Sequence, residues 1–230
     1  MPVAIVTGAS RGFGRALAVD LAKDGWSLVV DGRRAGPLEE VSRSLGALGV
    51  PVASIAGDVT DPGHVAALVE AAAALGGLDL VVNNASTLGP SPLPTLDRYP
   101  LEALQRVFEV NVLAPLALVQ AALPLLRRAG GTIVSISSDA AVEAYEGWGG
   151  YGSSKAALDQ LHRVLAAEQP ELHVYQFDPG DMRTEMHQAA FPGEDISDRP
   201  EPESAVPPLR RLLDSGAPSG RYRADEWVRS

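Results

Sequence analysis

Short runs of β-branched residues alternate with longer stretches of helical periodicity along almost the whole chain of 230 residues. This alternation is typical of βαβ units, in which a helix carries the chain from one strand to the start of the next parallel strand. The predicted strands cover residues 3–7, 26–31, 52–56, 78–82, 132–136, 172–177 and 220–222. The pattern therefore predicts an α/β fold built on a parallel sheet.

The predicted helices fill the intervals between these strands, and two of them carry clear end signals. Gly25 can cap the helix that begins near residue 12, and Asp61-Pro62 supplies an N-cap followed by proline at the first helical position. The other predicted helices cover residues 37–48, 101–128 (broken near Pro115), 151–168 and 204–214. No repeat or linker separates two cores, so residues 1–230 are expected to form one domain.

Composition and charge exclude several classes of protein. The chain has 19 basic and 29 acidic residues, a formal net charge of −10, which repels nucleic-acid backbones and anionic lipid surfaces. Because it has no cysteine, a disulfide scaffold and a thiolate metal site are excluded. Residues 1–6 lack the basic region of a signal peptide, and polar and proline residues interrupt residues 107–126. We expect a cytoplasmic protein without metal, nucleic-acid or membrane partners.

A glycine-rich turn follows the first predicted strand, where α/β folds place their phosphate-binding turn. In Thr7-Gly8-Ala9-Ser10-Arg11-Gly12-Phe13-Gly14, Gly8 permits a tight turn, Gly12 lets the backbone approach a pyrophosphate, and Gly14 lets the helix pack closely. A glycine turn without a ligand is the plainer interpretation. Residues 8–12 also match the G-x-S-x-G elbow of α/β-hydrolases, which would make Ser10 a nucleophile, but that elbow normally follows several strands.

Tyr151 and Lys155 lie four residues apart at the start of a predicted helix, and therefore on one face of it. A phenol titrates at about 10 and transfers protons poorly at neutral pH unless a nearby positive charge favours the phenolate, which Lys155 can supply. The chain has 17 arginines and only two lysines, so a lysine four residues after one of its five tyrosines is expected by chance only about 0.04 times. The pair is therefore predicted to transfer a proton.

Five motifs follow one another along the chain. They are Thr7-Gly8-x-x-x-Gly12-x-Gly14, Asn83-Asn84-Ala85, Ser138 thirteen residues before the tyrosine, Tyr151-x-x-x-Lys155 and Pro179-Gly180. This set spans essentially the whole chain and resembles the short-chain dehydrogenase/reductase family. The resemblance implies a Rossmann-type, doubly wound parallel sheet of about seven strands with helices on both faces, NAD(P) as the hydride carrier, and a homodimer or homotetramer.

The resemblance also implies roles for single residues. Tyr151 would be the general acid in carbonyl reduction or the base in alcohol oxidation, and Ser138 would hydrogen-bond the substrate oxygen. Lys155 would lower the pKa of Tyr151, and Asn111 would position a relay water, although asparagine at a helix break also suits a structural role. The implied cofactor-binding residues are Thr7, Gly8, Ser10, Arg11, Gly12, Phe13, Gly14, Arg33, Asp58, Val59, Asn83, Ala85, Tyr151, Lys155, Pro179, Gly180 and Thr184.

The residue facing the ribose 2′ position decides between NAD and NADP, since a carboxylate there selects NAD and arginine accommodates the phosphate of NADP. In NAD-specific family members the acid generally lies about eighteen residues after the last motif glycine; that place is Gly32 here, and Asp31 falls one residue short. Gly32 leaves room for a phosphate that Arg11 and Arg33 can clamp. The sequence thus favours NADP(H), with NAD(H) as the second possibility.

Three segments, residues 87–93, 140–150 and 181–192, are expected to bound the substrate pocket, and residues 179–204 are too long and polar for an ordinary connection and predict a lid. The predicted pocket residues are Asp139, Tyr145, Trp148, Met182 and Met186. Asp139 suits either a turn or the recognition of a polar substrate. The predicted function is an NADPH-dependent carbonyl reductase or alcohol dehydrogenase for a small-to-medium ketone, aldehyde or secondary alcohol. A non-catalytic NADP(H)-binding sensor or scaffold is the alternative, and a serine hydrolase the remote one.

Overall fold

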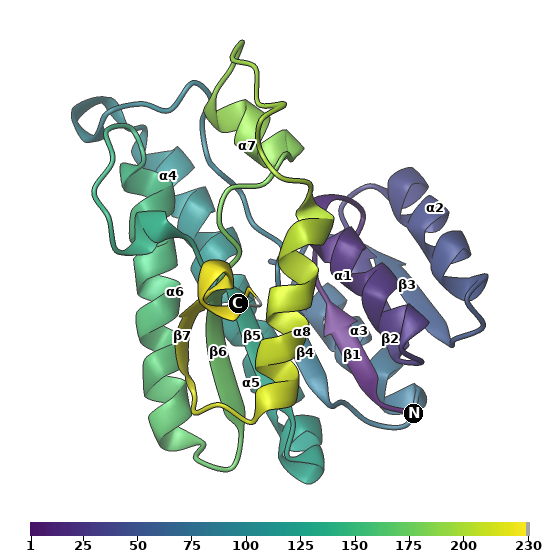
Figure 1. The fold of residues 1–230 in the computed structure, drawn as a ribbon. Coiled ribbons are helices and arrows are strands. Elements are labelled where there is room, and N and C mark those ends of the chain that lie inside the picture. The colour runs from purple at the N-terminus through teal and green to yellow at the C-terminus, as the bar shows by residue number, and fades with distance from the viewer. Residues whose placement is uncertain (229–230) are drawn as a thin grey trace.

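A seven-stranded parallel sheet with the strand order β3-β2-β1-β4-β5-β6-β7 forms the centre of the computed structural model, which describes residues 1–228 (Figure 1). The strands are β1 (Val3–Val6), β2 (Ser27–Gly32), β3 (Val52–Ala56), β4 (Leu80–Asn83), β5 (Thr132–Ile136), β6 (His173–Asp178) and β7 (Gly220–Arg223). The strand order runs outward from β1 in both directions, so the predicted doubly wound Rossmann-type sheet is confirmed.

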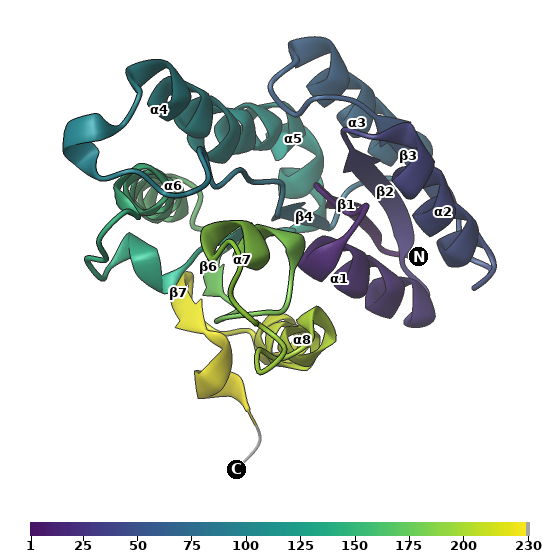
Figure 2. The same cartoon turned by 90° about the horizontal axis from the view of Figure 1, so that it is seen from above.

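Helices cover both faces of the sheet, as the view from above shows (Figure 2). They are α1 (Gly12–Lys23), α2 (Ala35–Gly46), α3 (Pro62–Ala74), α4 (Leu101–Phe108), α5 (Ala114–Ala129), α6 (Gly149–Glu168), α7 (Glu185–Ala190) and α8 (Val206–Ser215). One buried cluster joins the sheet to α1, α2 and α8, and a second joins it to α3, α5 and α6. Because both faces are covered, the central strands β1, β2 and β4 are entirely buried and carry almost only apolar residues.

The predicted helix over residues 101–128 differs from the structure at its break. A π-helical turn over Glu109–Leu113 separates α4 from α5. Pro115 lies in the first turn of α5, directly after the π-helical turn. The interruption is therefore a wide helical turn placed ahead of the proline, and it holds Asn111.

Residues 101–129 are the part of the described chain that is long and apolar enough, by length and composition alone, to cross a bilayer. Half of the most apolar window is buried inside the protein, where Leu118, Val119 and Leu126 join the core cluster on their face of the sheet. The apolar residues of this segment are thus largely used to cover the sheet.

Candidate active site

A cleft of about 490 Å³ runs along the carboxyl edge of the sheet, beside β1 and β4. Doubly wound sheets bind ligands at this reversal of strand order, because the segments that follow the two strands diverge to opposite faces. The cleft is lined by the turn after β1, by residues after β4 and β5, by the start of α6 and by residues 178–187, which include the start of α7. In Figure 1, α7 lies above the carboxyl edge of the sheet.

The turn between β1 and α1 has the backbone that its glycines allow. Gly8 and Gly12 have φ angles of 66° and 55°, in the left-handed region that favours glycine. A Cβ on Gly14 would lie 2.4 Å from the side-chain nitrogen of Asn84, which donates to the carbonyl oxygens of Thr7 and Gly8. α1 has neither a side-chain cap nor an acidic residue in its first turn, so its first N–H groups are left for an anion. The turn therefore fits a pyrophosphate.

The carboxylate at the end of β2 is engaged inside the protein. Asp31 is 1% exposed; its Oδ1 accepts from Gly8 N at 2.5 Å and its Oδ2 lies 3.0 Å from His64 Nε2. Asp31 therefore holds the glycine turn against α3.

Three arginines gather at the same end of the cleft. Burial, and then the charges of Arg34 and Arg33, lower the pKa of Arg11. Three positive charges placed this close together attract an anion. The predicted binding of a phosphate by Arg11 and Arg33 requires such a positive site. Arg34 is the member of this cluster that sequence reasoning missed, although its position beside Arg33 could have pointed to it.

Three residues predicted to touch the cofactor, Thr7, Gly14 and Asn83, do not line the cleft. Thr7 is 3% exposed, and its hydroxyl accepts the N–H groups of Asn84 and Ala85 at 3.0 Å each. Asn83 is equally buried and donates to Ser135 Oγ at 3.2 Å. Both side chains point into the protein at the ends of their strands. Thr7 links the end of β1 to the segment after β4, and Asn83 links β4 to β5. The predicted cofactor residues that line the cleft are Gly8, Ser10, Arg11, Gly12, Phe13, Arg33, Asp58, Val59, Ala85, Tyr151, Lys155, Pro179, Gly180 and Thr184.

Tyr151 and Lys155 lie in the first two turns of α6, and Ser138 is the second residue after β5. All three line the cleft. Lys155 Nζ lies 5.5 Å from the centre of the Tyr151 ring and donates to the carbonyl oxygen of Ile136 at 2.7 Å. Tyr151 is 8% exposed and Lys155 is 2% exposed. The structure thus brings together the three predicted catalytic residues that sequence spacing separates.

Burial has the largest effect on the proton affinities of Tyr151 and Lys155. It raises the pKa of Tyr151, and the carboxylates of Asp178 and Asp139 raise it further. Burial lowers the pKa of Lys155 to about 8, although Asp159 and Asp178 act in the opposite direction. The predicted lowering of the Tyr151 pKa is therefore wrong for this arrangement, because desolvation and nearby carboxylates outweigh an ammonium above the ring. A phenol that keeps its proton at neutral pH suits a proton donor.

Asn111 does not line the cleft, and its side chain has no capacity left for a relay water. Its Oδ1 accepts from Ser86 Oγ at 3.0 Å and from Thr87 N at 2.8 Å. Its Nδ2 donates to the Thr87 carbonyl at 2.9 Å and to Ser154 Oγ at 3.0 Å. These four bonds fix the loop after β4 against α6, so the structure supports the structural alternative for this side chain.

Arg221 of β7 is a site residue that sequence reasoning missed. Its guanidinium donates to the Ser138 carbonyl and to Asp178 Oδ2, both at 2.9 Å, and to Asp159 Oδ2 at 3.2 Å. Asp159 lies one helical turn after Lys155 on α6. Arg221 therefore joins the ends of β5 and β6 to the helix that carries the lysine. No local motif predicts these contacts, because the residues that Arg221 contacts lie 43 to 83 residues away in the sequence.

The predicted substrate-side residues that line the cleft are Asp139, Trp148, Met182 and Met186. The Trp148 ring meets the Tyr151 ring edge-on, with 5.8 Å between centroids. Tyr145 does not line the cleft; its hydroxyl donates to Asp139 Oδ2 at 3.0 Å from a half-exposed position. Apolar side chains therefore pack beside the Tyr151 phenol, and the carboxylates of Asp139 and Asp178 lie near it.

Ser10 lines the cleft but lacks the base that a nucleophile elbow needs. Each histidine of the chain has other partners: His64 contacts Asp31, His162 contacts Ser135, His173 contacts Tyr175, and His187 lies near Asp181. The structure therefore gives no support to a serine hydrolase.

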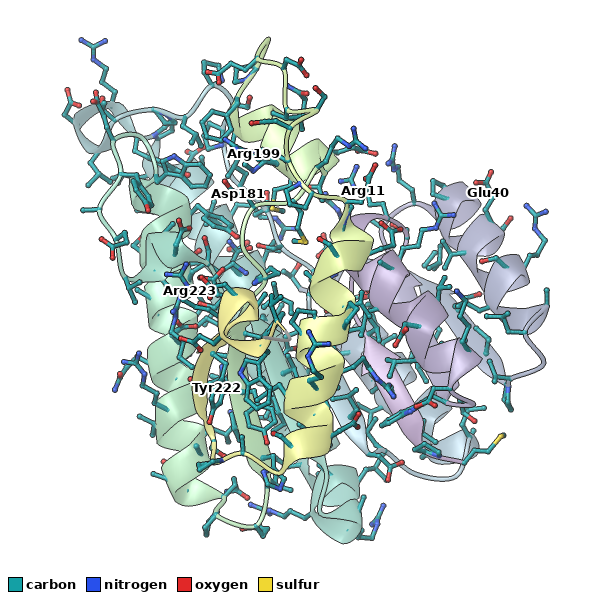
Figure 3. All side chains as sticks on the ribbon, in the orientation of Figure 1. Arg11, Glu40, Asp181, Arg199, Tyr222 and Arg223 are labelled. Atoms are coloured by element: carbon teal, nitrogen blue, oxygen red, sulfur yellow. The ribbon has the colours of Figure 1, made fainter. Side chains whose placement is uncertain are left out.

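The segment over residues 179–204 carries the short helix α7 and crosses above the carboxyl edge of the sheet (Figure 3). Arg11 in the glycine turn pairs with Glu185 at the start of α7, and Arg199 Nε lies 3.6 Å from Asp181 Oδ2. Thr184 caps α7 through its side chain. The segment is thus held by ion pairs and also by apolar packing, since Ala190, Met186 and Phe191 pack with the cluster of Leu88, Ala140 and Tyr151.

Comparison with known proteins agrees with this fold and cleft. The short chain dehydrogenase family matches residues 2–195. Sepiapterin reductase of Mus musculus is 36% identical over 228 residues, which cover 94% of this chain and 85% of the reductase. A short chain dehydrogenase of Shigella flexneri 2a, complexed with NADP, superposes with a TM-score of 0.90 at 30% identity and 97% coverage of each chain.

An alcohol dehydrogenase from the archaeon Thermococcus sibiricus, complexed with 5-hydroxy-NADP, superposes with a TM-score of 0.87 at 29% identity, over 97% of this chain and 95% of that chain. Agreement in sequence and in fold over this length shows common descent. The chain belongs to the short-chain dehydrogenase family and is an NAD(P)-dependent oxidoreductase that acts on C=O and CH–OH groups.

Proposed function

We propose that this protein is an NADPH-dependent carbonyl reductase, reversible as an alcohol dehydrogenase, for a small-to-medium ketone, aldehyde or secondary alcohol. The observation that carries the proposal is the convergence of Ser138, Tyr151 and Lys155 on one wall of a cleft that also contains the glycine turn. The similarity to a sepiapterin reductase and to two dehydrogenases in NADP complexes supports it. The test is NADPH oxidation by the purified protein with a panel of carbonyl compounds, where a sensor or scaffold would bind NADPH without turnover.

Each part of the cleft has a role in this proposal. The glycine turn and the N-terminus of α1 hold the pyrophosphate, and bound NADPH supplies the hydride that the carbonyl carbon receives. Ser138 Oγ donates a hydrogen bond to the substrate oxygen, and Tyr151 gives that oxygen its proton. The ammonium of Lys155 then stabilises the phenolate that remains. Residues 179–204 act as a lid within one domain of 230 residues.

The low pKa of Lys155 predicts the pH dependence of reduction. Because burial lowers the pKa of Lys155 to about 8, the ammonium is lost as the pH rises through this value, and the rate of carbonyl reduction is expected to fall above it. Between about pH 8 and 10.5, Lys155 holds fewer protons in the folded protein than in the unfolded chain. The free-energy cost of burying this residue therefore decreases, and its contribution to stability improves, as the pH rises through that window. The pH profile of kcat for the wild type and for Lys155→Arg checks this prediction. Because arginine keeps its charge, the fall in kcat should occur at a higher pH in the variant. If kcat fell at the same pH in both proteins, the fall could not be due to the deprotonation of Lys155.

The arginine cluster predicts the cofactor preference. Arg33→Ala is expected to raise the Kd for NADPH by about tenfold and to leave the Kd for NADH nearly unchanged, because only the 2′-phosphate loses a charge-assisted hydrogen bond. Binding is measured by quenching of protein fluorescence. The control is Arg43→Ala, which removes an exposed arginine near the end of α2. An equal loss of affinity for NADPH and NADH would show that Arg33 does not bind the 2′-phosphate.

We also propose a homodimer or homotetramer, which the family resemblance supports, and a cytoplasmic location. Sedimentation velocity of the purified protein and cell fractionation test these two statements.

A further inference from the structure

Asp139 places a carboxylate one hydrogen bond away from the hydroxyl that is proposed to hold the substrate oxygen. Its Oδ1 accepts from Ser138 Oγ at 3.0 Å and from Ala140 N at 2.8 Å, and its Oδ2 accepts from the Tyr145 hydroxyl at 3.0 Å. Asp139 itself lines the cleft beside Tyr151, whose pKa its charge helps to raise. It is therefore part of the surface that meets the reacting group.

No ion pair involves Asp139 within residues 1–228, whereas most other carboxylates of the cleft wall have a cation. The paired ones are Asp178 with Arg221, Asp181 with Arg199, Glu185 with Arg11, and Glu201 with Arg183. The side-chain hydrogen bond to Asp139 raises the pKa of Tyr145, and the charges of Asp139 and Glu143 raise it further. The carboxylate of Asp139 thus faces the cleft without an ion pair among the described residues, in contrast to the arginine cluster at the other end of the cleft.

The hydrogen bond from Ser138 to Asp139 has a consequence for binding. A serine hydroxyl has a single proton, so Ser138 must release Asp139 when it donates to a substrate carbonyl. A plain ketone leaves Asp139 Oδ1 without that donor, at a cost in binding. A substrate that carries a hydroxyl or amine on the carbon next to its carbonyl brings a replacement donor to the same place.

We propose that the substrate class is the α-hydroxy or α-amino carbonyl compounds with an apolar body, and that Asp139 selects them over plain ketones and against keto acids. This inference rests on the proposed function. The apolar body packs against Trp148, Met182 and Met186, which line the same end of the cleft. The unpaired charge of Asp139 repels a carboxylate on the substrate and so weakens the binding of keto acids. Tyr151, Ser138 and Lys155 keep the roles that the proposed function gives them.

The test compares kcat/KM for NADPH oxidation with acetophenone, 2-hydroxyacetophenone and benzoylformate, which share one ring and differ at the carbon next to the carbonyl. The wild type is expected to prefer 2-hydroxyacetophenone over acetophenone by about tenfold or more, since a hydrogen bond to a charged group is gained, and to use benzoylformate least. Asp139→Asn keeps an oxygen that can cap the same turn and removes the charge. It should reduce the preference several-fold and raise the rate with benzoylformate.

Two control variants separate contact from general electrostatics. Glu143→Gln removes a neighbouring exposed carboxylate that has no side-chain hydrogen bond to Ser138, and it should leave the hydroxyketone preference intact. Tyr145→Phe removes the phenol donor from Asp139 and should keep or increase the preference. Equal kcat/KM for the two neutral ketones, or an unchanged preference in Asp139→Asn, would overturn the inference while leaving carbonyl reduction in place. No NADPH oxidation with any of the three compounds would overturn both.

Discussion

Tyr151→Phe is expected to lower kcat for carbonyl reduction by about 10²- to 10⁴-fold, because the variant has no proton to give to the substrate oxygen. The packing of the ring should survive, since Phe retains the edge-on contact with Trp148 and the place in the apolar cluster beside Leu88 and Ala140. The measurement is single-turnover reduction at saturating NADPH. Thermal unfolding and NADPH binding are expected to stay close to the wild-type values.

Tyr145→Phe is the matched control for this substitution. It removes a phenolic hydroxyl from the same region of the protein, but that hydroxyl is bonded to Asp139 and does not line the cleft. Its effect on the reduction of acetophenone should be small. Wild-type turnover by Tyr151→Phe would instead favour a different proton donor, and absence of turnover in the wild type would favour the sensor or scaffold alternative.

Arg221→Gln is expected to lower the free energy of unfolding by about 3 kcal/mol, because two buried carboxylates lose their cation. Asp159 is 2% exposed and Asp178 is 4% exposed, so water cannot replace the guanidinium. The loss should shrink at acidic pH. Burial raises the pKa of Asp159 even beside its partners, and protonation removes the charge that the variant leaves unpaired. Urea unfolding of both proteins across a range of pH measures this.

Arg223→Gln is the control for the charge of the same strand. Arg223 lies two residues further along β7 (Figure 3) and is exposed, and its ion pair among the described residues is with Asp225 at 3.0 Å. Its loss should change the free energy of unfolding by about 0.5 kcal/mol or less. Arg221→Lys should recover part of the stability, because it restores a charge without the three-way geometry. Equal effects at the two positions would contradict the account of a buried clamp.

Local patterns in the chain were sufficient to predict the sheet. Strand boundaries were predicted to within two residues, because most of the strands, β1 to β5, are short runs with β-branched residues bounded by turn residues. The Asp61-Pro62 signal was likewise sufficient, and the Asp61 carboxylate accepts from Gly63 N as an N-cap should. The π-helical turn and α7 were not predicted, because neither a wide turn nor a six-residue helix has a distinct sequence pattern.

Local sequence patterns by themselves determined the strands of the parallel sheet, the glycine turn and the Tyr151-Lys155 face of α6, because each depends on residues that are neighbours along the chain. The doubly wound strand order was predicted from the family resemblance. Only the tertiary structure decided that Thr7, Asn83 and Asn111 turn inward, and that Asp31 is held by His64. It alone brought Arg221 beneath the catalytic wall and raised the pKa of Tyr151. Exposure, desolvation and long-range charge depend on which distant segments pack together, and no local pattern specifies them.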